Sequence, residues 1–135
     1  MNDCIFCKII EGEIPSYKVW ENKEFYAFLD INPNTTGATL LIPKIHHPSN
    51  PIKIPKNIMS EISESAVEVS KLLKNHFKDV ARVGLAIEGT GVDHLHVKLY
   101  PFHIQKNAKP TESSETFFTN YYQGFMTTKL GPQAN

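Results

Sequence analysis

The chain lacks the features that mark membrane proteins and large nucleic-acid-binding surfaces. No apolar run approaches the roughly 20 residues that a membrane-spanning helix requires. The 14 Lys and Arg residues balance the 14 Asp and Glu residues, which argues against an extended basic surface for DNA, RNA or lipid. The opening stretch MNDCIFCKIIEGEIP carries an acid near its start and an interrupted apolar run. We therefore expect no signal peptide and a cytoplasmic location.

Cysteine is also scarce, since the chain contains two. Two cysteines exclude the disulfide framework of small secreted domains, and in a reducing compartment such a pair binds metal or stays reduced more often than it forms a disulfide. A chain of 135 residues fits one ordinary domain and can bury roughly two-thirds of the surface that it exposes when unfolded. We therefore expect one domain that folds around a hydrophobic core.

The hydrophobic pattern predicts several short strands and one long helix. Aromatic and branched residues favour strands at 16–20, 24–30, 38–43, 81–89 and 92–101. Apolar residues three and four apart predict an amphipathic helix from about Asn57 to Phe77. This content indicates an α+β protein with a mostly antiparallel sheet. Residues 103–135 have little period, and we expect a tail that packs on the domain or on a partner subunit.

The segment VDHLHVKLYP, residues 92–101, carries the most chemistry. Because side chains alternate across a strand, two histidines and a lysine fall on one face. That face holds Val92, His94, His96, Lys98 and Tyr100, and the opposite face holds Asp93, Leu95, Val97 and Leu99. A neutral imidazole acts as a nucleophile, a base or a metal ligand. The alternative is that the histidines lie on an exposed face and have no function.

Three segments together resemble one family. CIFCKIIEGEIP, FYAFLDINPNTTGATLLIPKIHH and EGTGVDHLHVKLYP are similar to the histidine triad (HIT) superfamily of nucleotide hydrolases and transferases, over about three quarters of the chain. The resemblance is to the zinc-binding, bacterial-type branch of nucleotide-binding proteins. It implies a HIT-like fold over residues 1–102, with a short N-terminal helix beside the long one. It also implies a homodimer that pairs across the long helix and the fourth strand.

The resemblance assigns roles to the histidine strand. His96 falls at the position of the nucleophile that attacks the α-phosphorus of a nucleoside phosphate, and His94 falls at the first triad position, where a backbone carbonyl orients the nucleophile. A nucleotidyl-imidazole forms and is then released to water or to a second phosphate. Lys98 stands where most members have histidine. Lysine can hold a phosphate, but it is a poor proton shuttle.

Two further departures lie near the expected phosphate site. Ala38 follows Gly37 where the family often has histidine, and Ile87 precedes EG where asparagine is common. Two functions therefore remain open. The first is a nucleotide hydrolase or nucleotidyltransferase that acts through His96, Lys98 and His94. The second is a catalytically weak or inactive nucleotide-binding module that keeps the fold and its metal.

The spacing of Cys4 and Cys7 is C-x2-C, which alone fits a redox pair or half of a zinc site. A redox protein is the distant alternative, because the N-terminus lacks a βαβ pattern, and two unmetallated thiols are another. The resemblance implies structural zinc on Cys4, Cys7, His46 and His94, with His47 as the alternative to His46. Four protein ligands would fill a tetrahedral site.

The resemblance also implies a nucleotide pocket, for a purine nucleotide in the first instance. Its base-binding residues are apolar or aromatic, and one carboxylate is placed to accept the ribose hydroxyl groups. The residues are Ile5, Phe6, Ile9, Phe28, Leu29, Asp30 and Ile31. Most of them can equally be core residues, and Asp30 can equally cap the turn that follows it.

Overall fold

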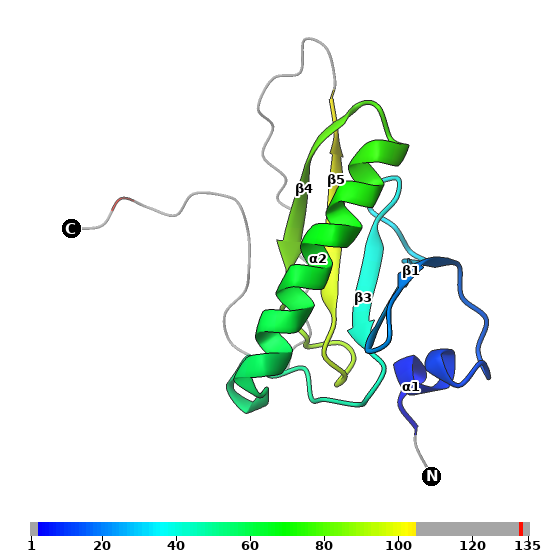
Figure 1. Cartoon of the computed structure of the whole chain (residues 1–135), viewed down its shortest axis with the longest axis vertical. Helices are drawn as coiled ribbons and strands as arrows, with labels where there is room; N and C mark the ends of the chain where they lie inside the picture. The colour runs from blue at the N-terminus through cyan, green and yellow to red at the C-terminus, as the bar shows by residue number, and fades with distance from the viewer. Residues whose placement is uncertain (1–2, 105–132, 134–135) are drawn as a thin grey trace. The chain divides into compact units, whose positions relative to one another are not determined.

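The computed structural model describes residues 3–104 and residue 133 (Figure 1). The chain divides into two units, Met1–Ile104 and Gln105–Asn135. From residue 105 onward, the predicted tail lies outside the described residues except for residue 133. Within the described residues, no helix has both the length and the apolar character needed to cross a membrane.

A five-stranded antiparallel sheet forms the frame of the first unit. Its strands lie in the order β1-β2-β3-β5-β4, so that β5 is inserted between β3 and β4. The strands are β1 Lys18–Glu21, β2 Phe25–Leu29, β3 Thr39–Pro43, β4 Val80–Ala86 and β5 Val97–His103. This sheet and its two helices confirm the α+β class and the mostly antiparallel pairing.

The long helix α2, Lys56–His76, covers one face of the sheet (Figure 1). It confirms the predicted helix to within one residue at each end. Its buried positions recur three and four apart, as an apolar stripe must if it is to face a sheet. They pack on buried residues of β2, β3 and β5, and they are Ile62, Ala66, Val69 and Leu73. The main hydrophobic core therefore lies between α2 and the sheet.

The short helix α1, Ile5–Ile10, packs against the sheet through a second, smaller cluster of buried residues. Phe6 of this helix contacts Phe28 of β2 edge to face, with ring centroids 5.7 Å apart, and Ile42 of β3 completes the cluster. The Cys4 sulfur caps the helix by accepting a hydrogen bond from the Cys7 N–H. The cap fixes the first turn of α1, and the buried Phe6 holds the helix near the end of β3 (Figure 1).

The predicted strand 92–101 is wrong at both ends, because β5 begins at Val97 and continues to His103. The ladder partners explain the late start. β4 ends at Ala86, opposite Lys98, and β3 pairs with β5 only as far as Leu41, opposite Val97. Ahead of Val97 the chain leaves the sheet, and the Leu95 N–H donates to the His47 carbonyl at 2.8 Å instead. Both histidines of interest therefore precede the strand.

Gly37 marks a turn that has no room for a side chain. Its φ is +87°, in the left-handed region, and an added Cβ would lie 2.5 Å from an aromatic carbon of Phe77. Gly12 has a similar φ of +81°, but a Cβ there would meet nothing within 4 Å. A side chain at Gly12 would therefore cause backbone strain alone, whereas a side chain at Gly37 would cause backbone strain and a steric clash.

We expect Gly37→Ala to cost clearly more stability than Gly12→Ala. Each substitution carries the left-handed penalty of about 1–2 kcal/mol. At Gly37 the contact with Phe77 adds the cost of overpacking, about 1–3 kcal/mol. Urea unfolding of both variants measures the difference. Equal losses of the free energy of unfolding would show that the Phe77 ring moves aside without cost.

Candidate functional site

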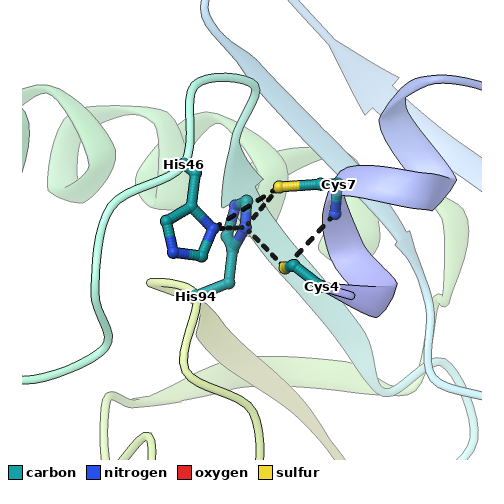
Figure 2. Close-up of side chains that lie close together, drawn as sticks. All are labelled: Cys4, Cys7, His46 and His94. Atoms are coloured by element: carbon teal, nitrogen blue, oxygen red, sulfur yellow. Dashed lines mark hydrogen bonds between the residues drawn. The ribbon is translucent and has the colours of Figure 1, made fainter. Parts of the chain in front are cut away.

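Four side chains from three separate segments converge on one point (Figure 2). Cys4 and Cys7 come from the start of α1, His46 from the loop after β3, and His94 from the segment before β5. Their Sγ and Nδ1 atoms all lie within 4.8 Å of one another, so the group can hold a metal ion. His47 is not a member of this group. Of the two adjacent candidates, the structure places His46 in the cluster.

Four of the separations between the ligand atoms are close to those around a tetrahedral ion. His94 Nδ1 lies 3.2 Å from Cys4 Sγ, 3.5 Å from Cys7 Sγ and 3.1 Å from His46 Nδ1, and Cys7 Sγ lies 3.4 Å from His46 Nδ1. Metal–ligand bonds of about 2.0–2.3 Å in a tetrahedron place neighbouring ligand atoms roughly 3.3–3.8 Å apart. One proton can join one pair of these atoms, but it cannot hold all four together, whereas a cation at their centre can.

The tautomer of His94 suits metal binding. Its Nε2–H donates to the Pro43 carbonyl at 2.9 Å, which leaves Nδ1 without a proton and directed at the cluster. Burial lowers the pKa of His94 to about 4, with smaller contributions from the neighbouring His46 and His96. The ring is 0% exposed and neutral at physiological pH. A carbonyl partner on the second ring nitrogen is the usual support of a metal-binding histidine.

His96 lies two residues further on and is oriented by the same segment. Its Nδ1–H donates to the backbone carbonyl of His94 at 2.8 Å. This bond fixes the tautomer, so that Nε2 carries the lone pair. The Phe6 ring contacts His96 edge to face, with centroids 5.3 Å apart. The half-buried His96 ring is thus held by one hydrogen bond and one aromatic contact, and its Nε2 can act as a nucleophile or a base.

Lys98 and Asp30, predicted for different parts of the site, lie against each other. The Lys98 Nζ is 3.3 Å from Asp30 Oδ2, and the Lys98 and Asp30 side chains are 28% and 14% exposed. The Nζ also lies 5.1 Å from the centre of the Tyr100 ring. Asp30 Oδ1 accepts the Asn32 N–H at 2.9 Å, so the predicted turn-capping bond is present. The sequence assigned a role to each residue but gave no reason to pair them.

The predicted base-pocket residues do not form one uniform surface. Phe6 and Phe28 are buried in the small cluster under α1, and Ile9 is partly buried beside them. Ile5 and Ile31 are exposed, at 45% and 77%. Leu29 is half-buried at the end of β2. Phe6 contacts Phe28 and both histidines, while Ile5 and Ile31 offer apolar surface.

One hydrogen-bond network near the site is not indicated by any sequence motif. The carboxylate of Asp93 accepts both the N–H and the hydroxyl of Ser49, at 2.9 and 3.2 Å, and the same hydroxyl lies 2.6 Å from the Gly89 carbonyl. The backbone bond from Ser49, followed by its hydroxyl bond, lowers the pKa of Asp93 despite a partial desolvation. Ser49 is buried, and Gly89 has a φ of +68° with no space for a Cβ against it. The network ties the loop before His94 to the loop that carries His46.

Glu88 is a second residue near His96 that no sequence motif indicates. Burial raises its pKa, but hydrogen bonds from Thr90, the electrostatic influence of the nearby His96 ring and the Gly89 N–H together lower the pKa below its usual value. An ionised carboxylate thus lies within electrostatic range of His96. The site around His96 therefore contains a carboxylate in addition to the cationic Lys98.

A family model places the chain in a known class. The model of the HIT domain matches residues 11–103, more than half of the chain, and the chain therefore belongs to the HIT domain family. Among solved structures, a Streptococcus mutans protein matches with a TM-score of 0.71 and 31% identity, covering 86% of this chain and 76% of that one. A HIT family member from Bacillus subtilis matches with a TM-score of 0.69 and 28% identity, covering 84% of each chain.

Curated relatives include two enzymes. The chain is 39% identical over 104 residues to adenosine 5'-monophosphoramidase HNT1 of Saccharomyces cerevisiae, covering 77% of this chain and 65% of the relative. It is 33% identical over 104 residues to adenylylsulfatase HINT3 of Arabidopsis thaliana, covering 74% and 52%. An uncharacterized HIT-like protein of Borreliella burgdorferi is 48% identical over 80 residues, covering 59% and 54%. The chain thus spans between about half and two thirds of the length of these relatives.

Proposed function

We propose that the chain is a nucleotide hydrolase or nucleotidyltransferase that forms a nucleotidyl-imidazole on His96. The observation that carries the proposal is the bond from His96 Nδ1–H to the His94 carbonyl, which leaves Nε2 as the attacking atom. The names of two relatives, a monophosphoramidase and an adenylylsulfatase, support a nucleoside phosphate as substrate. The family match supports the same class of reaction.

The proposed reaction has two steps. In the first, the lone pair of His96 Nε2 forms a bond to the α-phosphorus, and the bond to the leaving group breaks with its electron pair. In the second, water attacks the same phosphorus, the P–N bond breaks, and its electron pair returns to Nε2, while the water proton passes to solvent. A phosphate acceptor in place of water gives the transferase. The His94 carbonyl stabilises the positive charge that the ring gains in the first step.

The pocket residues act in this proposal by holding a purine nucleotide. The base would lie on the apolar surface of α1 and of the loop after β2, which includes Ile5, Ile9 and Ile31. Asp30 keeps acceptor capacity beyond its bonds to Asn32 and Lys98, because an ionised carboxylate has about four lone-pair sites. It can therefore accept the ribose hydroxyls as well.

We propose zinc as the ion of the four-residue cluster. Two thiolates and two neutral imidazoles suit zinc, and four protein ligands leave no open position, so the metal is structural. Cys4, Cys7, His46 and His94 would hold it. When bound, zinc supplies charge that keeps the four ligands together and links α1 to the segment that presents His96.

A second candidate function is a nucleotide-binding module with little or no turnover. The ion pair of Lys98 with Asp30 supports it, because two groups expected to contact the substrate already contact each other. In that case the fold and the metal are retained for binding alone.

One experiment separates the two functions. The protein is incubated with adenosine 5'-phosphoramidate or adenosine 5'-phosphosulfate, AMP release is followed, and samples quenched early are analysed by intact-protein and peptide mass spectrometry. The enzyme should release AMP and carry an adenylyl group on His96. Binding without release or adduct would support the module. Release by His96→Ala at the rate of the unchanged protein would rule out the proposed nucleophile.

The proposal includes a homodimer formed across β4 and α2. Among the described strands β4 is an edge strand, and its Leu85 is 48% exposed. A shallow groove of about 300 Å³ lies between α2 and β4, lined by apolar residues such as Val67 and Val83 with Lys71 and Lys74. An exposed edge strand beside apolar surface favours pairing with another strand.

We expect Leu85→Glu to shift the protein from dimer to monomer, because it places a charge in the proposed interface. Sedimentation velocity at several concentrations measures the change, with at least a 10-fold rise expected in the dissociation constant. Ile52→Glu is the matched control, since Ile52 is 91% exposed in a different part of the fold. A dimer unaffected by Leu85→Glu would place the interface elsewhere.

A further inference from the structure

The position of Lys98 bears on the leaving group of the reaction. Lys98 follows His96 by two residues, and two residues along an extended chain are roughly 6–7 Å apart on the same side. Buried Leu95, Val97 and Leu99 alternate with them and face the core. The Lys98 side chain therefore leaves the backbone on the same side as His96, where its ammonium group can reach a phosphate that is bonded to His96 Nε2.

The ammonium is held in place from two sides. Asp30 Oδ2 lies 3.3 Å away, and the Tyr100 ring centre lies 5.1 Å away. The contacts restrain a side chain that is otherwise long and flexible. Because the pair is largely shielded from solvent, the charge of Lys98 is screened less than that of a surface lysine. The site thus contains a positive charge at a restrained position, paired with the negative charge of Asp30.

An ammonium and an imidazolium do different chemistry at such a position. The ordinary pKa of lysine is about 10.4 and that of histidine about 6.5, so an imidazolium gives up its proton far more readily near neutral pH. An ammonium stabilises developing negative charge without transferring a proton. Lys98 is therefore suited to a leaving group that departs as an anion.

The two enzyme activities named among the relatives represent two kinds of leaving group. Cleavage of a phosphoramidate releases an amine or ammonia, whose nitrogen must take up a proton as the P–N bond breaks. Cleavage of an adenylyl sulfate releases sulfate, which is a stable anion and needs no proton. The same holds for other strongly acidic leaving groups, such as phosphate and pyrophosphate. The first class benefits from a general acid and the second from a fixed cation.

We infer that Lys98, held by Asp30, makes this site selective for nucleotidyl substrates with an anionic leaving group, adenylyl sulfate among them, over phosphoramidates. The inference rests on the proposed nucleotidyl transfer to His96. In the selective step, Nε2 bonds to the α-phosphorus, the P–O bond to sulfate breaks, and its electron pair leaves on the sulfate oxygen. No proton moves in this step. Lys98 is a specificity-determining residue here, and its positive charge lowers the energy of the departing anion.

Competing substrates test the inference directly. The values of kcat/KM are measured for adenosine 5'-phosphosulfate and adenosine 5'-phosphoramidate. We expect the unchanged protein to prefer the phosphosulfate by at least about 10-fold. In Lys98→His the phosphoramidate should gain about 10-fold or more relative to the phosphosulfate, since a positioned general acid contributes about 10²–10⁴-fold. Lys98→Met should lose activity chiefly on the phosphosulfate, and Lys98→Arg should keep the preference.

A leaving-group series distinguishes this role from a purely structural one. Aryl esters of AMP with phenols of different acidity are hydrolysed, and the logarithm of kcat/KM is plotted against the pKa of the phenol. The unchanged protein should show a steep decline as the phenol becomes less acidic, and Lys98→His should show a shallower one. Loss of folding alone would lower all points together and leave the slope unchanged. The metal content and melting temperature of each variant verify folding.

The possible results of these experiments distinguish a failure of the inference from a failure of the proposed function on which it rests. If neither substrate is turned over, or if His96→Ala remains active, the proposed function is wrong and the inference fails with it. If turnover requires His96 but the phosphoramidate is preferred, only the inference is wrong. The inference is also wrong, with the proposed function intact, if Lys98→His leaves both the ratio and the slope unchanged.

Discussion

His46→Ala is expected to lose the proposed zinc and to melt at least about 10 °C lower than the unchanged protein, whereas His47→Ala should keep the metal and nearly all of its stability. The two histidines are adjacent, but only His46 belongs to the converging group. His47 contributes its backbone carbonyl, which accepts the Leu95 N–H at 2.8 Å and survives the substitution. The pair is therefore a matched test of ligand identity.

The large effect follows from what remains when a ligand is removed. Structural zinc contributes about 10–16 kcal/mol of apparent binding free energy in small zinc domains, and much of this is folding free energy. Without the ion, the Nδ1 of the fully buried His94 faces the two sulfur atoms with no cation between them. A loss of about 3 kcal/mol already corresponds to a shift of roughly 10 °C in a domain of this size.

Elemental analysis and calorimetry measure this prediction. Zinc per chain is determined by mass spectrometry after purification without chelators, and the melting temperature is recorded with and without added chelator. Chelator should lower the melting temperature of the unchanged protein and of His47→Ala, and it should leave that of His46→Ala almost unchanged. Equal zinc content in the two variants would contradict the assignment of His46.

His96→Ala is expected to reduce kcat by at least about 10⁴-fold while leaving zinc content unchanged. Removal of a nucleophile costs up to about 10⁶-fold in enzymes in which the effect has been measured. The ring donates a hydrogen bond to the carbonyl of His94 and makes an aromatic contact with Phe6. Neither contact involves a ligand atom of the four-residue cluster, so we expect a melting temperature within about 2 °C of the unchanged protein.

Single-turnover kinetics with isothermal titration of AMP measure the two effects separately. The affinity for AMP should change by no more than a few-fold, because the nucleophile contributes to the reaction more than to binding. His76→Ala is a suitable control, since His76 is exposed on α2. A large loss of AMP affinity in His96→Ala would indicate that the ring is a binding group, as the module without turnover predicts.

The sequence predicted the elements that are marked by a regular spacing of apolar residues. It missed the features that depend on a single contact between distant segments. The helix Lys56–His76 was predictable because its apolar residues recur over the whole element. The prediction that Leu95, Val97 and Leu99 face the core was also correct. However, this alternating burial already starts at Leu95, two residues before β5 begins. Alternation reports which side of an extended chain is buried, and it does not report whether a partner strand is present.

The candidate site shows the same limit. The choice between His46 and His47 could not be made from spacing, because adjacent residues differ only in the direction that the loop gives them. The contact between Lys98 and Asp30 joins residues of β5 and the loop after β2, which no local pattern connects. The four metal-ligand positions came from family resemblance and not from the pattern of one sequence. The structure then brought those four residues together.

His94 contacts two parts of the site through different atoms. Its ring lies in the four-residue cluster, and its carbonyl oxygen accepts the hydrogen bond from His96. Replacing the proposed zinc with cobalt would therefore install a coloured, paramagnetic reporter on a residue that is hydrogen-bonded to the proposed nucleophile. Absorption bands of the cobalt and the shifted NMR signals of the nearby imidazole would then report nucleotide occupancy without any label attached to the substrate. The metal centre would become a built-in spectroscopic probe of the adjacent chemistry.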